Sequence, residues 1–394
     1  MKQSSWFRYL LFGLLALLWV YGLYDLSHSN KQWDFKTYYF AAVAQERGLD
    51  PYDVKVSEQL AGSPVKLSYV YPPLTLWFFR LFTLFSFEHA NIIFLILKFA
   101  LLVILFLLWR RYLFEGEDDL LLLWFITLAY SSCVYWDFVS GNIGLFEQVF
   151  FWIAIIALLR KNMPLFASAI VAISFFKLTI IVFLALPLLW RQKQALHYAI
   201  AGSVVFVGYL IVNYLFAPLD FKSFFSILRA IDERGEAYNH SLLAMIRDIF
   251  DKSEAAPWLH SIPSIVPDLI YIAGAALILI ASWRVHKMRS KGAESASNLE
   301  TIYLACLVYA LAMPRMKSYS FILLIPPTYY VIRKCVKPEA FFFLFVLLAL
   351  TKWTPLPVPD LVRFLWWYFP WLAALLVWML YLRYLNAAKT LPVR

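Results

Sequence analysis

The chain has 394 residues, of which 62% are hydrophobic and 15% charged, and its formal net charge at pH 7 is +10. Soluble domains are about 45–50% apolar, so this composition excludes an ordinary soluble enzyme. It predicts an all-α, polytopic membrane protein with a single integral membrane domain over residues 1–394. The basic excess is interpreted as a topology signal rather than a nucleic-acid surface, because no nucleic-acid-binding motif accompanies it.

The N-terminal region sets the predicted topology. Lys2 and Arg8 flank the first apolar run, which predicts a cytoplasmic N-terminus. No small-x-small cleavage site follows this run, so we expect a retained signal anchor. Residues 25–71 then lie outside. The apolar piece 72–87 opens with two prolines and contains Arg80, and it is predicted to be a half-helix that returns to the outer face.

With that half-helix, the later basic clusters fall on the cytoplasmic side, as the positive-inside rule requires. About twelve transmembrane helices result. Their predicted bounds are 6–24, 88–110, 119–136, 143–160, 162–176, 178–190, 195–216, 264–284, 299–314, 318–332, 338–352 and 360–385.

Two long outer loops, 25–87 and 217–263, are expected to cover the functional site. The first is predicted to hold interfacial helices, including one over 35–47. The second begins with an amphipathic piece, 221–231, that is expected to lie in the membrane interface. Long loops on a rigid scaffold are where binding and catalytic residues concentrate.

Several polar side chains remain near the predicted outer ends of spans once topology is assigned. A charge at membrane depth is costly unless it faces a cavity or a partner, so these residues are functional candidates. They are Asp34, Lys36, Arg80, Asp137, Asn142, Glu147, Lys177, Asn239, His240, Arg247, Arg315 and Lys317.

Three of these cations are predicted to bind a phosphate. Arg315 and Lys317 follow Pro314, which ends a helix, and they lie on the side that the positive-inside rule disfavours. Lys177 lies between apolar residues at a predicted outer turn. The alternative is that all three only reach toward lipid headgroups.

Asp34 has two interpretations that its position does not separate. It can act as a general base toward an acceptor hydroxyl, or it can cap the helix predicted to follow it. Asp137 is either a second outer acid or the structural partner of a cation. Glu147 lies one turn inside a span, and His240 is a base, a hydroxyl contact or an ordinary loop residue.

Tyrosines gather in the first outer loop. They suit stacking on sugar rings, although most aromatics of such a chain belong to the interfacial belt and the core. They are Tyr38, Tyr39, Tyr52, Tyr69 and Tyr71. The cysteines Cys133, Cys306 and Cys335 form no CxxC or His-associated cluster, so neither a disulfide framework nor a metal site is expected.

No P-loop, GxGxxG, HExxH or GxSxG motif is present, which argues against a cytosolic nucleotide as direct substrate. The first loop, however, resembles that of the GT-C membrane glycosyltransferases and is most similar to glycosyltransferase family 87, the polyprenol-phosphate-mannose-dependent mannosyltransferases. The resemblance covers about residues 30–330. It is carried by Asp34-Phe35, Tyr38-Tyr39, Ala41-Ala42, Gly48-Leu49-Asp50-Pro51-Tyr52, Tyr69-Val70-Tyr71-Pro72-Pro73, Gly141-Asn142, Lys177, Asn239-His240-Ser241-Leu242, Arg247 and Pro314-Arg315.

This resemblance implies an inverting glycosyltransferase of the cytoplasmic membrane whose site faces the periplasm or exterior. The donor would be a polyprenyl-phosphate sugar, with mannose as the expected sugar, and the acceptor a lipid or glycan hydroxyl. No cofactor or metal is implied. Asp34 matches the family's aspartate base. The family often has a histidine after the late proline, where this chain has Arg315-Met316-Lys317-Ser318-Tyr319, so sugar identity stays open.

Two other classes fit part of the pattern. A transporter or flippase of lipid-linked sugars would also carry outer cations and aromatics, but its polar groups should lie near mid-membrane. A non-catalytic glycan-binding protein would keep the pocket without needing Asp34. Clustering of the polar residues at one predicted face favours the enzyme.

Overall fold

The computed structural model describes residues 5–28, 31–190, 192, 194–231, 233–234, 239–252, 262–263, 265–290, 298–335, 338–349 and 360–387. Over these residues the chain is helical, and the β pairing in them amounts to one isolated bridge between Asn239 and Lys317. The all-α prediction is therefore confirmed. The end of the predicted span 338–352 lies outside the described residues.

The chain divides into two compact units, which are described separately. The first unit contains Met1–Trp124 and Tyr135–Ile231, and the second contains Phe125–Val134 and Asp232–Arg394. The prediction of a single domain concerns the whole chain and stays a prediction.

The first unit is built from ten α-helices and two 3-10 helices among its described residues. They are α1 (Ser5–His28), α2 (Trp33–Glu46), α3 (Val54–Ala61), η1 (Pro73–Thr75), α4 (Leu76–Arg80), α5 (Phe87–Tyr112), α6 (Asp119–Ser140), α7 (Gly144–Leu159), α8 (Met163–Ser174), η2 (Leu178–Trp190), α9 (Ala195–Phe216) and α10 (Pro218–Ala230).

The second unit takes the middle of α6 and the later helices. These are α11 (Leu242–Lys252), α12 (Ile265–Ser290), α13 (Asn298–Ala312), η5 (Ser318–Leu324), α14 (Ile325–Cys335), α15 (Pro338–Ala349) and α16 (Asp360–Ala387). Within α6, Tyr130, Ser131 and Ser132 have φ values of 52°, 57° and 60°. That left-handed stretch interrupts the helix, so α6 consists of two shorter pieces.

Six of the described helices are long and apolar enough to cross a membrane, namely α1, α5, α6, α9, α12 and α16. The apolar helices α7, α8, η2 and α13 are shorter. The bounds of the predicted spans match these elements closely, but the count of about twelve spans stays a prediction. Segment 72–87 holds only η1 and the five-residue helix α4. A helix of that size is about 7.5 Å long and cannot cross a hydrocarbon core of about 30 Å.

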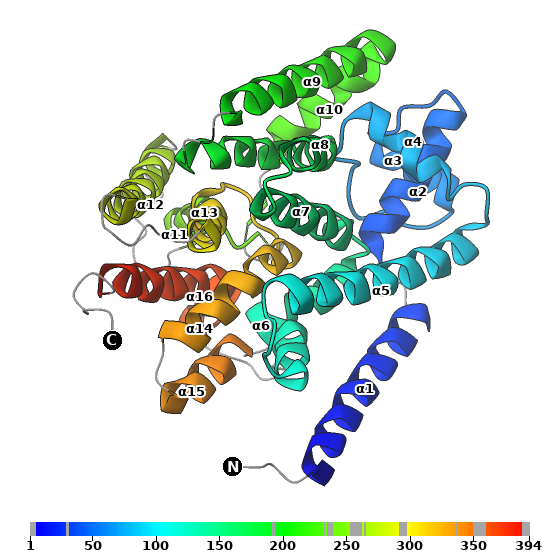
Figure 1. Cartoon of the computed structure of the whole chain (residues 1–394). Coiled ribbons are helices and arrows are strands. Elements are labelled where there is room, and N and C mark those ends of the chain that lie inside the picture. Colours follow the sequence, from blue (N-terminus) through cyan, green and yellow to red (C-terminus); the bar gives the residue numbers. More distant parts are fainter. Residues whose placement is uncertain are drawn as a thin grey trace. The chain divides into compact units, whose positions relative to one another are not determined.

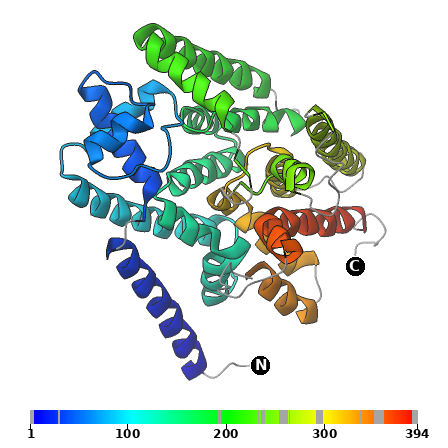
Figure 2. The same cartoon turned by 180° about the vertical axis from the view of Figure 1, so that it is seen from behind.

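The first loop folds as a compact module on α5. Helices α2, α3 and α4 gather around the N-terminal end of α5, and α1 leaves on the other side of α5 in both views (Figures 1 and 2). Aromatic rings join these elements: Phe35 stacks on Phe94 with ring centroids 4.2 Å apart, and Tyr38 lies 4.6 Å from Phe79. Each such pair contributes about 0.5–1.5 kcal/mol beyond the area that it buries. The loop predicted from sequence is therefore a packed module that holds α2 in place.

Candidate active site

Asp34 lies in the first turn of α2 and is only 6% exposed. The N-cap position belongs to Gln32, which has a left-handed backbone (φ 62°), and no side-chain hydrogen bond caps the helix. The N-cap interpretation of Asp34 is therefore wrong. Its carboxylate Oδ2 instead accepts a hydrogen bond of 2.7 Å from Nδ2 of Asn142, far along the sequence.

Asn142 links Asp34 to the buried tyrosines of the first loop. Its Nδ2 group also donates to the Tyr38 hydroxyl at 2.8 Å, and that hydroxyl lies 3.1 Å from the Tyr71 hydroxyl. Both protons of the amide group are thereby directed, one to a carboxylate and one to a phenol. Burial, with the nearby Glu147 charge, raises the pKa of Tyr71 well above its usual value. The phenol therefore stays protonated and available as a donor.

A glycine lets the α6–α7 turn approach the start of α2. Gly141 has a φ of +71°, and a Cβ there would lie 2.9 Å from the Gln32 Cα and 3.0 Å from the Phe35 Cβ. The Gln32 amide donates to the carbonyl oxygen of Val139 at 2.7 Å. Since a side chain at residue 141 would collide with this backbone, the turn that carries Asn142 and the helix that carries Asp34 meet only through glycine.

Lys98 is a buried charge that the sequence analysis missed. It lies within α5, is fully buried, and places Nζ 2.7 Å from Oδ2 of Asp137, which is fully buried as well. The same ammonium donates to the backbone oxygens of Asp137 and Asn142, the latter at 2.7 Å. The signal was present, because Lys98 interrupts an otherwise apolar run and a charge at that depth is a functional candidate. Asp137 is thus the partner of a cation.

Glu147 and Lys177 form a second pair in this unit. Lys177 follows α8, where its amide donates to the carbonyl oxygen of Ile173 at 2.9 Å, and its Nζ lies 3.3 Å from Oε2 of Glu147. The side chains are 20% and 8% exposed, respectively. The predicted turn at Lys177 is confirmed, and this turn brings the cation to an acid from α7.

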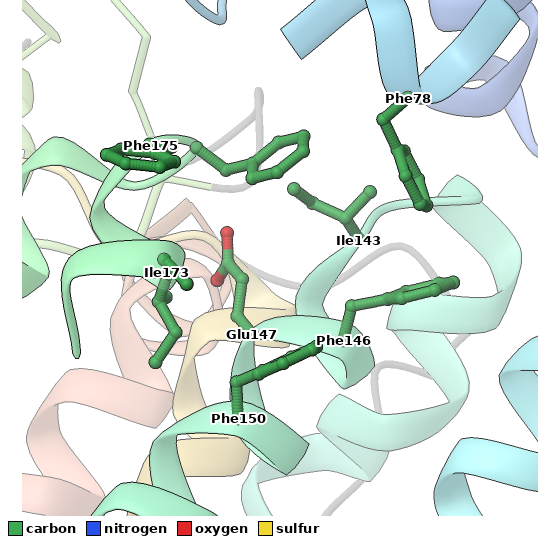
Figure 3. A pocket seen from close by; sticks show the side chains of 9 residues that line it. Phe78, Ile143, Phe146, Glu147, Phe150, Ile173 and Phe175 are labelled. Carbon is green, nitrogen blue, oxygen red and sulfur yellow. The ribbon is translucent and has the colours of Figure 1, made fainter. Parts of the chain in front are cut away.

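Beside this pair lies an apolar pocket with a volume of about 280 Å³. Figure 3 shows the Glu147 carboxylate among the apolar side chains of the wall. The lining residues come from α4, α7, α8 and the segments that flank them: Phe78, Ile143, Phe146, Glu147, Phe150, Ala172, Ile173, Phe175 and Phe176. Ligand pockets are typically about 300–1,000 Å³ and mostly apolar with a few polar groups, so this pocket can hold part of an apolar ligand.

Lys36 and Tyr39, also expected in the site, bond to other parts of the first loop. Lys36 Nζ donates to Ser63 Oγ at 2.8 Å and to the Pro64 carbonyl at 2.9 Å, and burial lowers the pKa of Lys36. Tyr39 donates to the carbonyl oxygen of Phe85 at 2.8 Å. These contacts fix the loop around α2.

In the second unit, Arg315 and Lys317 share one carboxylate. Arg315 Nε lies 2.7 Å from Oε2 of Glu233, and Lys317 Nζ lies 2.8 Å from Oε1 of the same side chain. Burial alone would raise the pKa of Glu233, but the charges of Arg315 and then Lys317 outweigh burial and hold the pKa below its usual value. Glu233 was not among the sequence candidates, since it belongs to a loop without a motif.

The predicted residues Asn239, His240 and Arg247 all bond within the second unit. Asn239 Oδ1 accepts from the amide of Met316 at 3.0 Å, and His240 Nε2 lies 2.6 Å from Ser318 Oγ. Arg247 pairs with Asp268 of α12 at 2.9 Å.

These bonds connect the 239–241 segment to the chain that follows Pro314, as the isolated bridge from Asn239 to Lys317 also shows. The structure thus brings Arg315, Lys317, Asn239 and His240 together in this unit.

Comparison with protein families decides the class. The model of Glycosyltransferase family 87 matches residues 69–314, which is more than half of the chain. The chain belongs to glycosyltransferase family 87. No curated protein and no solved structure matched it.

As a family 87 member the protein is a membrane glycosyltransferase, with a sugar donor and an acceptor. The matched region includes Asn142, Glu147 and Lys177 but begins after Asp34 and ends before Arg315. In this family 87 protein Asp34 is therefore a candidate because of its contacts and not because of the family match. Within the described ranges, no group of three or more His, Cys, Asp or Glu side chains is placed to hold a metal ion. The expectation of a metal-independent, cofactor-free reaction stays a prediction.

Proposed function

We propose that this family 87 enzyme transfers mannose from a polyprenyl-phosphate-linked donor to a hydroxyl of a lipid or glycan acceptor. The reaction would take place at the outer face of the cytoplasmic membrane and invert the anomeric centre. The observation that carries the proposal is the buried Asp34 carboxylate, held by Asn142 in the unit that also contains an apolar pocket and a lysine.

Asp34 acts as the general base. It takes the proton of the acceptor hydroxyl while that oxygen attacks C1 of the sugar. The bond from C1 to the phosphate oxygen breaks, and its electron pair leaves with the polyprenyl phosphate. Asn142 supports this role because it orients the carboxylate before the substrate arrives, and Tyr38 fixes the Asn142 amide by accepting its second proton.

Lys177 stabilises the leaving phosphate. Negative charge grows on the polyprenyl phosphate in the transition state, and a positioned cation is worth about 3 kcal/mol there, by analogy with a lost oxyanion donor. Lys177 already pairs with Glu147, so binding of the donor phosphate exchanges one anion for another. The same role for Arg315 and Lys317, which belong to the second unit, remains a prediction from the sequence.

The pocket beside Glu147 receives the part of the isoprenoid chain next to the phosphate. Phenylalanine rings of α4, α7 and the end of α8 line it, and such a surface suits an unsaturated hydrocarbon. Tyr38 and Tyr71, which are linked to Asp34 through Asn142, are our candidates for contact with the sugar or acceptor. We keep Asn239, His240 and Arg247 as substrate-binding candidates from the sequence. The contact of Asp137 with Lys98 supports its other interpretation, the structural partner of a cation, and the contacts of Lys36 and Tyr39 support a role in shaping the loop.

The test uses purified protein with polyprenyl-phosphate mannose and a membrane lipid acceptor fraction. We expect release of polyprenyl phosphate together with mannosylated acceptor, and no turnover with a nucleotide sugar. Asp34→Asn should abolish transfer while donor binding persists. Asp53→Asn is the matched control: Asp53 is an exposed first-loop aspartate that caps α3, and asparagine caps equally well.

Transfer at the wild-type rate by Asp34→Asn would remove Asp34 from the mechanism. Movement of the donor across a bilayer without transfer would favour the flippase alternative.

A further inference from the structure

Lys98 is a fully buried lysine of the first unit to which the proposed function assigns no role. It lies eleven residues into α5, about 17 Å from the start of that helix, and is fully buried. The rings of Phe94 and Phe138 flank its ammonium, with centroids 5.7 Å and 5.3 Å from Nζ. A lysine in such surroundings is expensive, and an apolar side chain would fill the space at lower cost. Its contacts explain what it does there.

The polar partners of the ammonium all belong to the same turn. They are the carboxylate of Asp137, the backbone oxygen of Asp137 and the backbone oxygen of Asn142. The two backbone oxygens accept hydrogen bonds from the ammonium, and the carboxylate is its ion-pair partner at 2.7 Å. Lys98 therefore holds the end of α6 and the first residue after Gly141 in one place.

The same turn presents the amide side chain that touches the base. Asn142 accepts from Lys98 through its backbone oxygen, and its Nδ2 donates to Asp34 Oδ2 at 2.7 Å and to the Tyr38 hydroxyl at 2.8 Å. One residue thus joins a buried charge in α5 to the carboxylate in α2. A shift of this turn would move the hydrogen-bond donors that orient Asp34.

We propose that Lys98 is a positioning residue for sugar transfer, acting through the backbone of the α6–α7 turn and the Asn142 side chain on Asp34. The inference rests on the proposed function and deepens it. This positioning role differs from packing alone. It depends on the hydrogen bonds from the ammonium to the two carbonyl oxygens and not only on the neutralisation of Asp137.

Three variants separate these contributions. Lys98→Met removes every bond and leaves Asp137 buried without its cation. Lys98→Met with Asp137→Asn also removes that orphaned charge, which should restore much of the thermal stability. Asp137→Asn alone keeps the lysine and both carbonyl bonds. A misplacement of about 1 Å in a site costs about 100-fold in rate. We expect both variants that lack Lys98 to lose about 100-fold in kcat with little change in the donor KM, and Asp137→Asn to retain most of kcat.

A double-mutant cycle of Lys98→Met with Asn142→Ala tests whether Lys98 acts through Asn142. If Lys98 acts through Asn142, then Lys98→Met should cost little in kcat once Asn142 is already alanine, so the two losses will not add. Additive losses would overturn the proposal, because they would mean that the lysine and the asparagine act independently.

Trp109→Leu is the stability control. Trp109 is a fully buried residue of the same helix that packs against Trp152, 6.0 Å away, and bonds to nothing in the Asn142 turn. It should lower the melting temperature without the fall in kcat. If kcat instead follows melting temperature across all these variants, Lys98 is only a structural support and the proposal fails.

Asp34→Asn, measured alongside, separates a failure of the proposed function from a failure of the positioning role of Lys98. An active Asp34→Asn enzyme contradicts the base, whereas an inactive one beside a fully active Lys98→Met contradicts only the positioning role.

Discussion

Lys177 lies 3.3 Å from the Glu147 carboxylate, in a position where the proposed donor phosphate would compete with that carboxylate. Glu147→Gln keeps the shape of the side chain and removes the competing charge. We expect polyprenyl phosphate to bind this variant about five- to tenfold more tightly, which corresponds to roughly 1 kcal/mol. Product inhibition constants measure the effect.

Lys177→Gln is the matched opposite change and should weaken binding. If Glu147→Gln also weakens binding, Glu147 contacts the substrate directly instead of holding the lysine.

Glu233, in the second unit, gives a pH dependence with a defined sign. Its pKa lies below the ordinary value of 4.5 because Arg315 and Lys317 stabilise its charge. The stabilisation is therefore complete above about pH 4.5 and is lost as the pH falls through the lower folded value. Glu233→Gln should lower stability by roughly 2 kcal/mol at pH 7, and the difference from wild type should shrink below pH 4.5.

Thermal unfolding of both proteins in detergent, from pH 7 to below pH 4.5, measures this difference in stability. The control is Glu115→Gln, at an exposed glutamate, which should leave the curve unchanged. A pH-independent difference would contradict the ion-pair explanation.

Asp34, Asn142 and Lys177 could be predicted as candidates from their residue types and their order in the sequence. Their hydrogen-bond and ion-pair partners could not. The contact between Asp34 and Asn142 spans 108 positions and depends on a left-handed Gly141 that lets two backbones touch. The sequence does not single out Lys98, because it lies within an apolar run that predicts a helix. It does not single out Glu233 either, because a loop glutamate carries no motif. Pairing partners depend on tertiary contacts, which local patterns do not encode.

At the element scale, apolar runs predicted the helices well. The predicted spans 88–110 and 195–216 correspond to α5 (Phe87–Tyr112) and α9 (Ala195–Phe216). Less was predictable where the backbone departs from the α-helix. Span 318–332 is in fact the 3-10 helix η5 followed by α14, and span 119–136 is interrupted within α6. Hydropathy measures the length of an apolar run but not the hydrogen-bonding pattern within it.

Segment 72–87 provides a direct test of topology. Since α4 is too short to cross, Ser86, which is exposed and occupies the N-cap position of α5, should lie on the outer side. A cysteine at Ser86, in a protein whose three native cysteines are replaced by alanine, should react with a membrane-impermeant maleimide in intact cells. A cysteine at Glu115, in the short connection after α5, should react only after permeabilisation. The reverse pattern would show that 72–87 crosses.

At the scale of the whole molecule, the positive residues predict that both termini are cytoplasmic. A reporter that is active only in the cytoplasm should therefore work when fused after residue 394, and a reporter that needs export should fail there. The same reporters inserted after Gly62, in the first loop, should give the opposite result. An exported C-terminus would require an odd number of spans and would contradict the predicted count of about twelve.

The pairing of Lys177 with Glu147 also affects how the proposed site distinguishes its donor from the phospholipids of the surrounding bilayer. Phospholipid phosphates vastly outnumber any polyprenyl-linked sugar, and an open cation at this depth would be occupied by them. In the proposed function a phosphate must first displace Glu147 from Lys177. We therefore expect a ligand to bind well only if its hydrocarbon also fills the aromatic pocket lined by Phe78 and Phe176. An ordinary acyl chain lacks the methyl branches that such a wall accommodates. We therefore expect turnover to be nearly insensitive to the anionic lipid content of the membrane, and the Glu147→Gln enzyme to become inhibited by it.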